Sequence, residues 1–210
     1  MSEYGYIPEA PEQKWISNKG IFTPNDIYDL TIDDKFKNLG QLELIETKTG
    51  SGVSAIDFTS IKGSTYNVHF LTITDFQIAT DGQPMGLRFS NGSFISSGYQ
   101  WGLQIGQADG TTDEARSTSS TYLELNRFNG NATNEKANGY VYLYNLGDSN
   151  KYSFYTSHVT ATLEYSTRYG MQFGSGVHPT AETISGIRLT TTSGNISASS
   201  VSLYGIKAYS

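Results

Sequence analysis

The chain has 210 residues, a formal net charge of −6 and no cysteine. Nucleic acids and anionic membranes bind clustered Lys and Arg, so an acidic chain with scattered basic residues disfavours both as partners. The missing cysteines exclude disulfides and thiolate metal sites. Twenty-two glycines and fifteen tyrosines, with abundant Ser and Thr, favour an all-β fold with frequent turns.

Residues 1–40 differ in composition from the rest, because they hold three of the five prolines and several isolated aromatic side chains. Such a segment has too few apolar residues to form its own core, yet a solvated tail usually lacks aromatics. We therefore expect an extended anchoring arm that docks on a neighbouring surface, with a disordered tail as the alternative. The residues expected to anchor the subunit are Tyr4, Tyr6, Trp15, Phe22, Pro24, Ile27 and Tyr28.

One short helix is predicted within this arm, starting at Thr23-Pro24-Asn25-Asp26. Thr23 is a good N-cap, Pro24 suits the first helical position, and the Asp26 carboxylate lies near the positive end of the helix dipole. Ile27, Leu30 and Tyr28 would form the buried face, and Gly40 is the last position at which the helix can end.

Residues 41–210 are predicted to form one antiparallel β-sandwich or jelly roll. Alternating apolar runs are separated by turn signals such as Asp81-Gly82 and Asn91-Gly92, and also by Asn138-Gly139 and Gly174-Ser175-Gly176. The predicted strands are 41–48, 53–61, 65–79, 85–90, 99–105, 120–128, 139–145, 151–166, 183–191 and 199–207.

Several strands indicate which side chains face the core. Between 121 and 127 the leucines alternate with Glu124 and Asn126, which predicts one buried and one wet face. The strand over 66–73 and the last strand are apolar on both faces, which predicts cover on both sides, and Gly205 suggests a bulge or a close backbone approach. The predicted core residues are Leu123, Leu125, Val141, Leu143, Ile187, Leu189, Val201 and Leu203.

Three tyrosines, Tyr140, Tyr142 and Tyr144, alternate with Val141 and Leu143 and should therefore lie in a row on the outside of one strand. Such a row can form a contact surface for a glycan or a protein. Ordinary cross-strand pairing is the alternative.

No pattern of catalytic or metal-ligating residues is evident, so we expect no catalytic residue, cofactor or metal. The three histidines lack ligand spacing, and His69 is expected in or near the core. Glycosidases need only two carboxylates brought together by the fold, and Glu124 and Glu164 are candidates for such a pair. Asp109 to Glu114 share a predicted loop that offers oxygen ligands for calcium, but the loop lacks the spacing of a known calcium-binding motif, which favours a solvated turn.

Two stretches bring a family resemblance. The last strand, S-L-Y-G-I-K, preceded by I-x-x-I-R-L-x-x-x-S-G-N, and the run from Phe58 to Gly92 resemble jelly-roll proteins of tailed-bacteriophage virions, usually described as tail-fibre or structural proteins. Together these stretches bracket residues 55–207. The run G-x-F-x-P-N-D-I-Y-D-L also resembles a head segment of marine-phage virion proteins.

The resemblance implies a non-enzymatic virion protein of the tail-fibre or adsorption type, anchored by its arm. Its expected partners are other virion proteins, itself as a homotrimer, and a glycan of the host surface. A capsid decoration or neck protein is the first alternative, and a carbohydrate-binding module or glycan-cleaving enzyme is the second. The N-terminus has no apolar region typical of a signal peptide, so we expect synthesis in the host cytoplasm and localisation in the virion.

Overall fold

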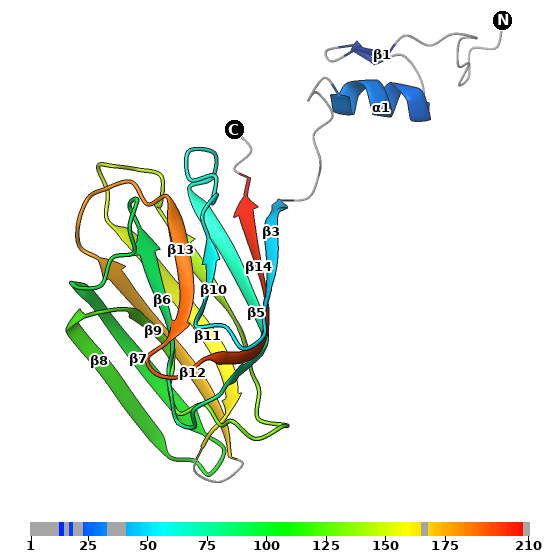
Figure 1. The fold of residues 1–210 in the computed structure, drawn as a ribbon. Helices are drawn as coiled ribbons and strands as arrows, with labels where there is room; N and C mark the ends of the chain where they lie inside the picture. Colours follow the sequence, from blue (N-terminus) through cyan, green and yellow to red (C-terminus); the bar gives the residue numbers. More distant parts are fainter. Residues whose placement is uncertain (1–12, 15–16, 19–22, 33–40, 165–167, 208–210) are drawn as a thin grey trace, which may run out of the picture. The chain divides into compact units, whose positions relative to one another are not determined.

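The computed structural model describes residues 13–14, 17–18, 23–32, 41–164 and 168–207. The chain divides into two units, residues 1–41 and 42–210. The described part of the first unit holds the strand pair β1 (Gln13–Lys14) and β2 (Ser17–Asn18) and the helix α1 (Pro24–Ile32). The second unit holds the two large sheets (Figure 1). Among the described residues no helix is long and apolar enough to cross a membrane.

The start of α1 confirms the predicted cap. The Thr23 hydroxyl accepts a hydrogen bond from the Asp26 N–H at 3.2 Å, and the Asp26 carboxylate accepts one from the Thr23 N–H at 2.8 Å. This reciprocal pair corresponds to a capping box. The pKa of Asp26 is lowered by the Thr23 hydroxyl, which donates to the carboxylate at 2.6 Å, and then by the Thr23 N–H. On α1 the side chains of Ile27 and Tyr28 are 38% and 65% exposed, so their burial against another surface stays a prediction. Tyr4, Tyr6, Trp15, Phe22 and Gly40 lie outside the described residues.

The second unit is an antiparallel β-sandwich, as predicted. Its larger sheet has eight strands, and every neighbouring pair in it is antiparallel. In spatial order these strands are β3 (Leu42–Gly50), β14 (Ile196–Ile206), β5 (Val68–Ile78), β10 (Ala137–Tyr144), β11 (Ser153–Thr162), β12 (Tyr169–His178), β7 (Tyr99–Gln107) and β8 (Thr112–Ser120).

The smaller sheet has four antiparallel strands and packs against the inner face of the larger one (Figure 1). The chain crosses between the two sheets several times, so that strands consecutive in sequence, such as β13 and β14, belong to different sheets. In spatial order the four strands are β4 (Ala55–Phe58), β13 (Gly186–Thr191), β6 (Met85–Ser90) and β9 (Leu123–Asn126).

The predicted core is confirmed. All eight of the apolar residues singled out in the sequence are at most 1% exposed and belong to one hydrophobic cluster between the sheets. His69 is also fully buried, and its Nε2 lies 2.7 Å from the carbonyl oxygen of Ile61. The alternation of side chains along each strand therefore places the apolar set inward in both sheets.

Gly205 lies where the backbone comes close to a ring. A Cβ at this position would approach the Tyr66 ring to 2.3 Å, which confirms the expected close approach, and the β14–β3 register shifts just before it. Cover on both faces was predicted for β5 and β14, and this is wrong. The outward side chains Phe70 and Tyr204 are only half-buried, by each other and by neighbouring rings.

Two strands of the second unit, β12 and β8, were not predicted. β12 contains Gly174-Ser175-Gly176, which was expected to be a turn, and Asn138-Gly139 likewise lies inside β10. The physical reason is close backbone packing: a Cβ at Gly174 would lie 2.6 Å from the Gly102 carbonyl oxygen. β8 was also expected to be part of a loop, because its sequence is almost wholly polar, as an edge strand allows.

Candidate functional site

The outer face of the eight-stranded sheet carries the tyrosine row that the sequence predicts. Tyr140, Tyr142 and Tyr144 point outward from β10 because Val141 and Leu143 between them point into the core. The antiparallel register places Tyr140 opposite His158 of β11, and Tyr142 opposite Phe70 of β5. This part of the face is therefore aromatic across three neighbouring strands.

The rings touch one another but remain partly open to solvent. The Phe70 and Tyr142 ring centroids are 4.9 Å apart, and the Tyr140 and His158 centroids are 5.8 Å apart. Tyr142 and Tyr144 are stacked with a centroid separation of 6.5 Å. Tyr140 is 41% exposed. Cross-strand pairing of the row is thus present, and it leaves ring surface accessible.

A shallow cavity of about 490 Å³ lies over these tyrosines. Its opposite side is formed by β12, whose outward residue Phe173 stands directly across from His158 and is 48% exposed. The complete lining is Tyr140, Tyr142, Tyr144, Thr156, Ser157, His158, Met171 and Phe173.

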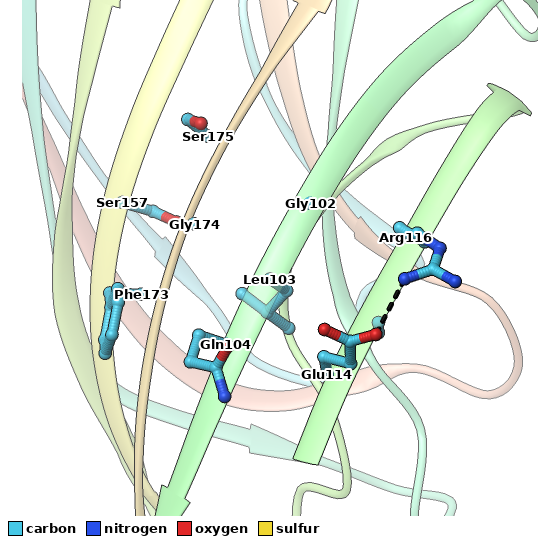
Figure 2. A pocket seen from close by; sticks show the side chains of 10 residues that line it. Gly102, Leu103, Gln104, Glu114, Arg116, Ser157, Phe173, Gly174 and Ser175 are labelled. Carbon is cyan, nitrogen blue, oxygen red and sulfur yellow. Dashed lines mark hydrogen bonds and ion pairs between the residues drawn. The ribbon is translucent and has the colours of Figure 1, made fainter. Parts of the chain in front are cut away.

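A second shallow cavity, of about 560 Å³, adjoins the first and shares Ser157 and Phe173 with it. Figure 2 shows Phe173 on one side of this cavity, Gln104 on the neighbouring strand β7, and Glu114 and Arg116 on β8 beyond it. Gly102 provides open space between them, because a Cβ added there would meet no heavy atom within 4 Å. We call the two adjoining cavities the sheet groove.

The polar side of the groove is exposed and fixed by local bonds. Arg116 donates to the Glu114 carboxylate at 2.6 Å, and the Gln104 amide donates to the Asp113 carbonyl oxygen at 3.1 Å. Asp113 and Glu114 belong to β8 and not to a loop with Asp109, which corrects the sequence interpretation. Among the described residues no group of His, Asp and Glu is arranged to hold a metal ion.

Glu124 was expected on a wet strand face, and this is wrong, since the residue is fully buried. β9 contacts β7, β11 and β12 of the larger sheet, and the Tyr155 hydroxyl donates to the Glu124 backbone carbonyl oxygen at 2.6 Å. The Glu124 side chain itself bonds to Tyr122 and Arg127, which lie close to it in sequence. Asn126, expected on the same wet face, is buried too and bonds to Asn129.

The buried Glu124 carboxylate is paired with the Arg127 guanidinium and accepts a hydrogen bond from the Tyr122 hydroxyl at 3.3 Å. Burial raises the pKa of Glu124, and Arg127 acts in the opposite direction. The guanidinium also lies 5.8 Å from the centroid of the Trp101 ring. A cavity of about 260 Å³ adjoins this cluster, and Glu164 is not among its lining residues.

Comparison of the chain with protein-family models, with curated proteins and with solved structures finds no match. The functional assignment consequently rests on the geometry of the groove and on the resemblance given by the sequence. Of the predicted site residues, the structure brings Tyr140, Tyr142 and Tyr144 together, and it places Pro24, Ile27 and Tyr28 on α1. Phe173, Gln104 and Gly102 were missed, because their part in the groove arises only when β7 and β12 pair.

Proposed function

We propose that the protein is a non-enzymatic, adsorption-type protein of a bacteriophage virion that contacts a host-surface glycan through the sheet groove. The observation that supports this most is the pairing of open aromatic rings with hydrogen-bonding side chains in one groove. Sugar rings present apolar C–H faces and a rim of hydroxyls. Tyr140 and Phe173 can stack against the apolar faces of the sugar. Gln104, Glu114 and Arg116 can form hydrogen bonds with the hydroxyls.

The length of the groove favours an extended saccharide over a single sugar. The two cavities adjoin across β10, β11, β12, β7 and β8, and each is shallow. A chain of several sugars could lie across these strands with aromatic contacts at one end and polar contacts at the other. Such binding relies on several weak contacts and not on one deep pocket.

Direct binding of polysaccharides to the purified protein tests the glycan half of this proposal. Titration calorimetry with bacterial surface polysaccharides should give binding that Phe173→Ala weakens by about tenfold or more, since a stacked ring contributes about 1–3 kcal/mol. Tyr152→Ala is the matched control, because Tyr152 is 47% exposed, close to the 48% of Phe173, and lines neither cavity. Equal affinities for both variants and the unchanged protein would contradict the proposal.

The virion half rests on the resemblance over residues 55–207 and is tested on particles. Mass spectrometry and antibody labelling of purified virions should locate the chain at the tail. Labelling over the whole shell would instead indicate the decoration alternative. Glycan binding without any chain in particles would indicate a free-standing carbohydrate-binding module. Release of reducing ends that disappears in Glu124→Gln would place the protein among glycan-cleaving enzymes.

A further inference from the structure

The outer face of the four-stranded sheet carries two arginines as direct neighbours. Arg188 of β13 pairs in register with Arg88 of β6, and both point outward because Leu87, Phe89, Ile187 and Leu189 on either side of them point into the core. Like charges directly opposite each other on antiparallel strands repel. The arrangement therefore needs a negative partner for each guanidinium.

Only Arg188 has such a partner. Its guanidinium makes two bonds of 2.7 Å to the Asp57 carboxylate, which stands opposite it on β4, and it lies 3.8 Å from the centroid of the Phe94 ring. This two-pronged pairing uses both oxygens of Asp57. Both carboxylate oxygens of Asp57 therefore bond to Arg188, and Asp57 does not form a bidentate ion pair with Arg88.

Arg88 makes no hydrogen bond or ion pair with any residue that the structure describes, and its Nε is inaccessible to solvent and unbonded. The neighbouring carboxylates have other partners: Glu124 is held by Arg127, and Glu182 accepts from Asn91 at 2.7 Å. A half-buried guanidinium with an enclosed, unbonded nitrogen is unusual, because leaving such a donor unsatisfied costs free energy.

The charge on this face also differs from that of the whole chain. The six ionisable groups Asp57, Arg188, Arg88, Glu124, Arg127 and Glu182 carry three positive and three negative charges when ionised, so this face is neutral in a chain of net charge −6. Tyr122, just before β9, lies close enough that the charge on Arg88 lowers its pKa, against the larger raising effect of burial. Among the described residues of this face, the positive charge without a bonded carboxylate is thus that of Arg88.

We propose that Arg88 is the centre of an oxyanion-binding site on the outer face of the four-stranded sheet. The ligand is an acidic group, a carboxylate or a phosphate, that binds the terminal nitrogens of the guanidinium. A planar guanidinium with free N–H groups matches either oxyanion with two parallel bonds. The site lies on the sheet opposite the sheet groove, so it is independent of glycan binding there.

The test observes the Arg88 Nε–H directly by nitrogen-15 NMR of the whole chain, with acetate and inorganic phosphate as probes and chloride at equal ionic strength as reference. The Arg88 resonance, identified by its absence in Arg88→Lys, should shift and saturate with acetate, with phosphate or with both. A response to acetate alone assigns a carboxylate, and a response to phosphate alone assigns a phosphate group.

Affinity is measured from the backbone amides of residues 87–89. Arg88→Gln should weaken binding of the responding probe by at least about tenfold, since a charge-assisted pair of bonds is lost. Arg168→Gln removes the same charge from an exposed pair with Asp109, outside both cavities of the sheet groove, and should leave the affinity unchanged. If Arg88→Gln does not fold, the shift in the unchanged protein decides. Identical spectra in acetate, phosphate and chloride would overturn the proposal.

Discussion

Arg127 neutralises the buried carboxylate of Glu124 on β9. Arg127→Met leaves the Glu124 carboxylate enclosed without its cation, and breaking a buried ion pair in this way costs about 3–5 kcal/mol of unfolding free energy. We expect a loss of this size in urea denaturation at pH 7. Arg116→Met is the matched control, because its partner Glu114 is exposed, and it should change stability little.

The same variant should show a defined pH dependence. Burial already raises the pKa of Glu124 above 4.5, and loss of Arg127 removes a group that lowers it. A carboxyl group with a raised pKa binds its proton more tightly in the folded state, so stability falls as pH rises from the unfolded pKa to the folded one. The deficit of Arg127→Met should therefore be smaller at pH 4.5 than at pH 7. An equal deficit at both would contradict a buried ionised Glu124.

At this scale the sequence predicted the core but not the burial of Glu124. Alternation along 123–126 shows that Leu123 and Leu125 share one face and that Glu124 and Asn126 share the other. It does not show what encloses the second face. The groups that bond to the Glu124 side chain here are Tyr122 and Arg127. Gln172 in turn bonds to the Arg127 backbone through both its amide nitrogen and its amide oxygen.

At the scale of elements, the pairing of β12 with β7 depends on glycine. Gly174→Ala places a Cβ 2.6 Å from the Gly102 carbonyl oxygen, and the backbone must move to relieve this. We expect a loss of about 1–3 kcal/mol in thermal or urea unfolding. Gly102→Ala is the control on the adjoining strand, because its Cβ meets nothing within 4 Å and should leave stability nearly unchanged. Equal losses would mean that backbone freedom, and not close packing, explains both glycines.

The two glycines also explain what the sequence did not predict about the elements. Glycine clusters usually indicate turns, and Gly174-Ser175-Gly176 fits that rule locally. The close contact with β7 that makes glycine necessary exists only after the two strands have paired. The groove was missed for the same reason, since Gly102 contributes open space to it and no side chain. By contrast, the tyrosine row was predicted because all its members lie on one strand.

The cap of α1 is an element whose start was predicted from sequence alone. Thr23→Ala removes the hydroxyl that accepts from the Asp26 N–H, which should cost the helix about 0.5–2 kcal/mol. Cα chemical shifts of residues 24–28 should move toward unfolded values. Thr23→Ser keeps the hydroxyl and should keep the shifts. Unchanged shifts in Thr23→Ala would show that the helix is held by contacts other than its cap.

For the whole molecule, the two outer faces of the sandwich differ in chemistry. The eight-stranded sheet presents aromatic rings with polar neighbours, and the four-stranded sheet presents charged side chains with one unpaired guanidinium. A protein with a single contact needs only one such face. The proposed glycan groove and the proposed oxyanion site therefore lie on different faces, and each can be tested without disturbing the other.

The last prediction concerns the arm. Residues 42–210 contain both sheets and the whole hydrophobic cluster between them, so deletion of residues 1–37 should leave the far-ultraviolet spectrum of the β domain unchanged. Ile27 and Tyr28 on α1 are exposed, and burying one such side chain contributes about 1.5–3 kcal/mol before the cost of ordering the segment. We expect the full chain to form trimers in light scattering and to enter particles, and the truncated chain to do neither.

Trp15→Ala combined with Tyr28→Ala should cause most of this loss of assembly. Tyr152→Ala changes an exposed tyrosine of the β domain and should cause no loss. Normal assembly of the truncated chain would locate the anchor on the sandwich and make residues 1–37 a tail.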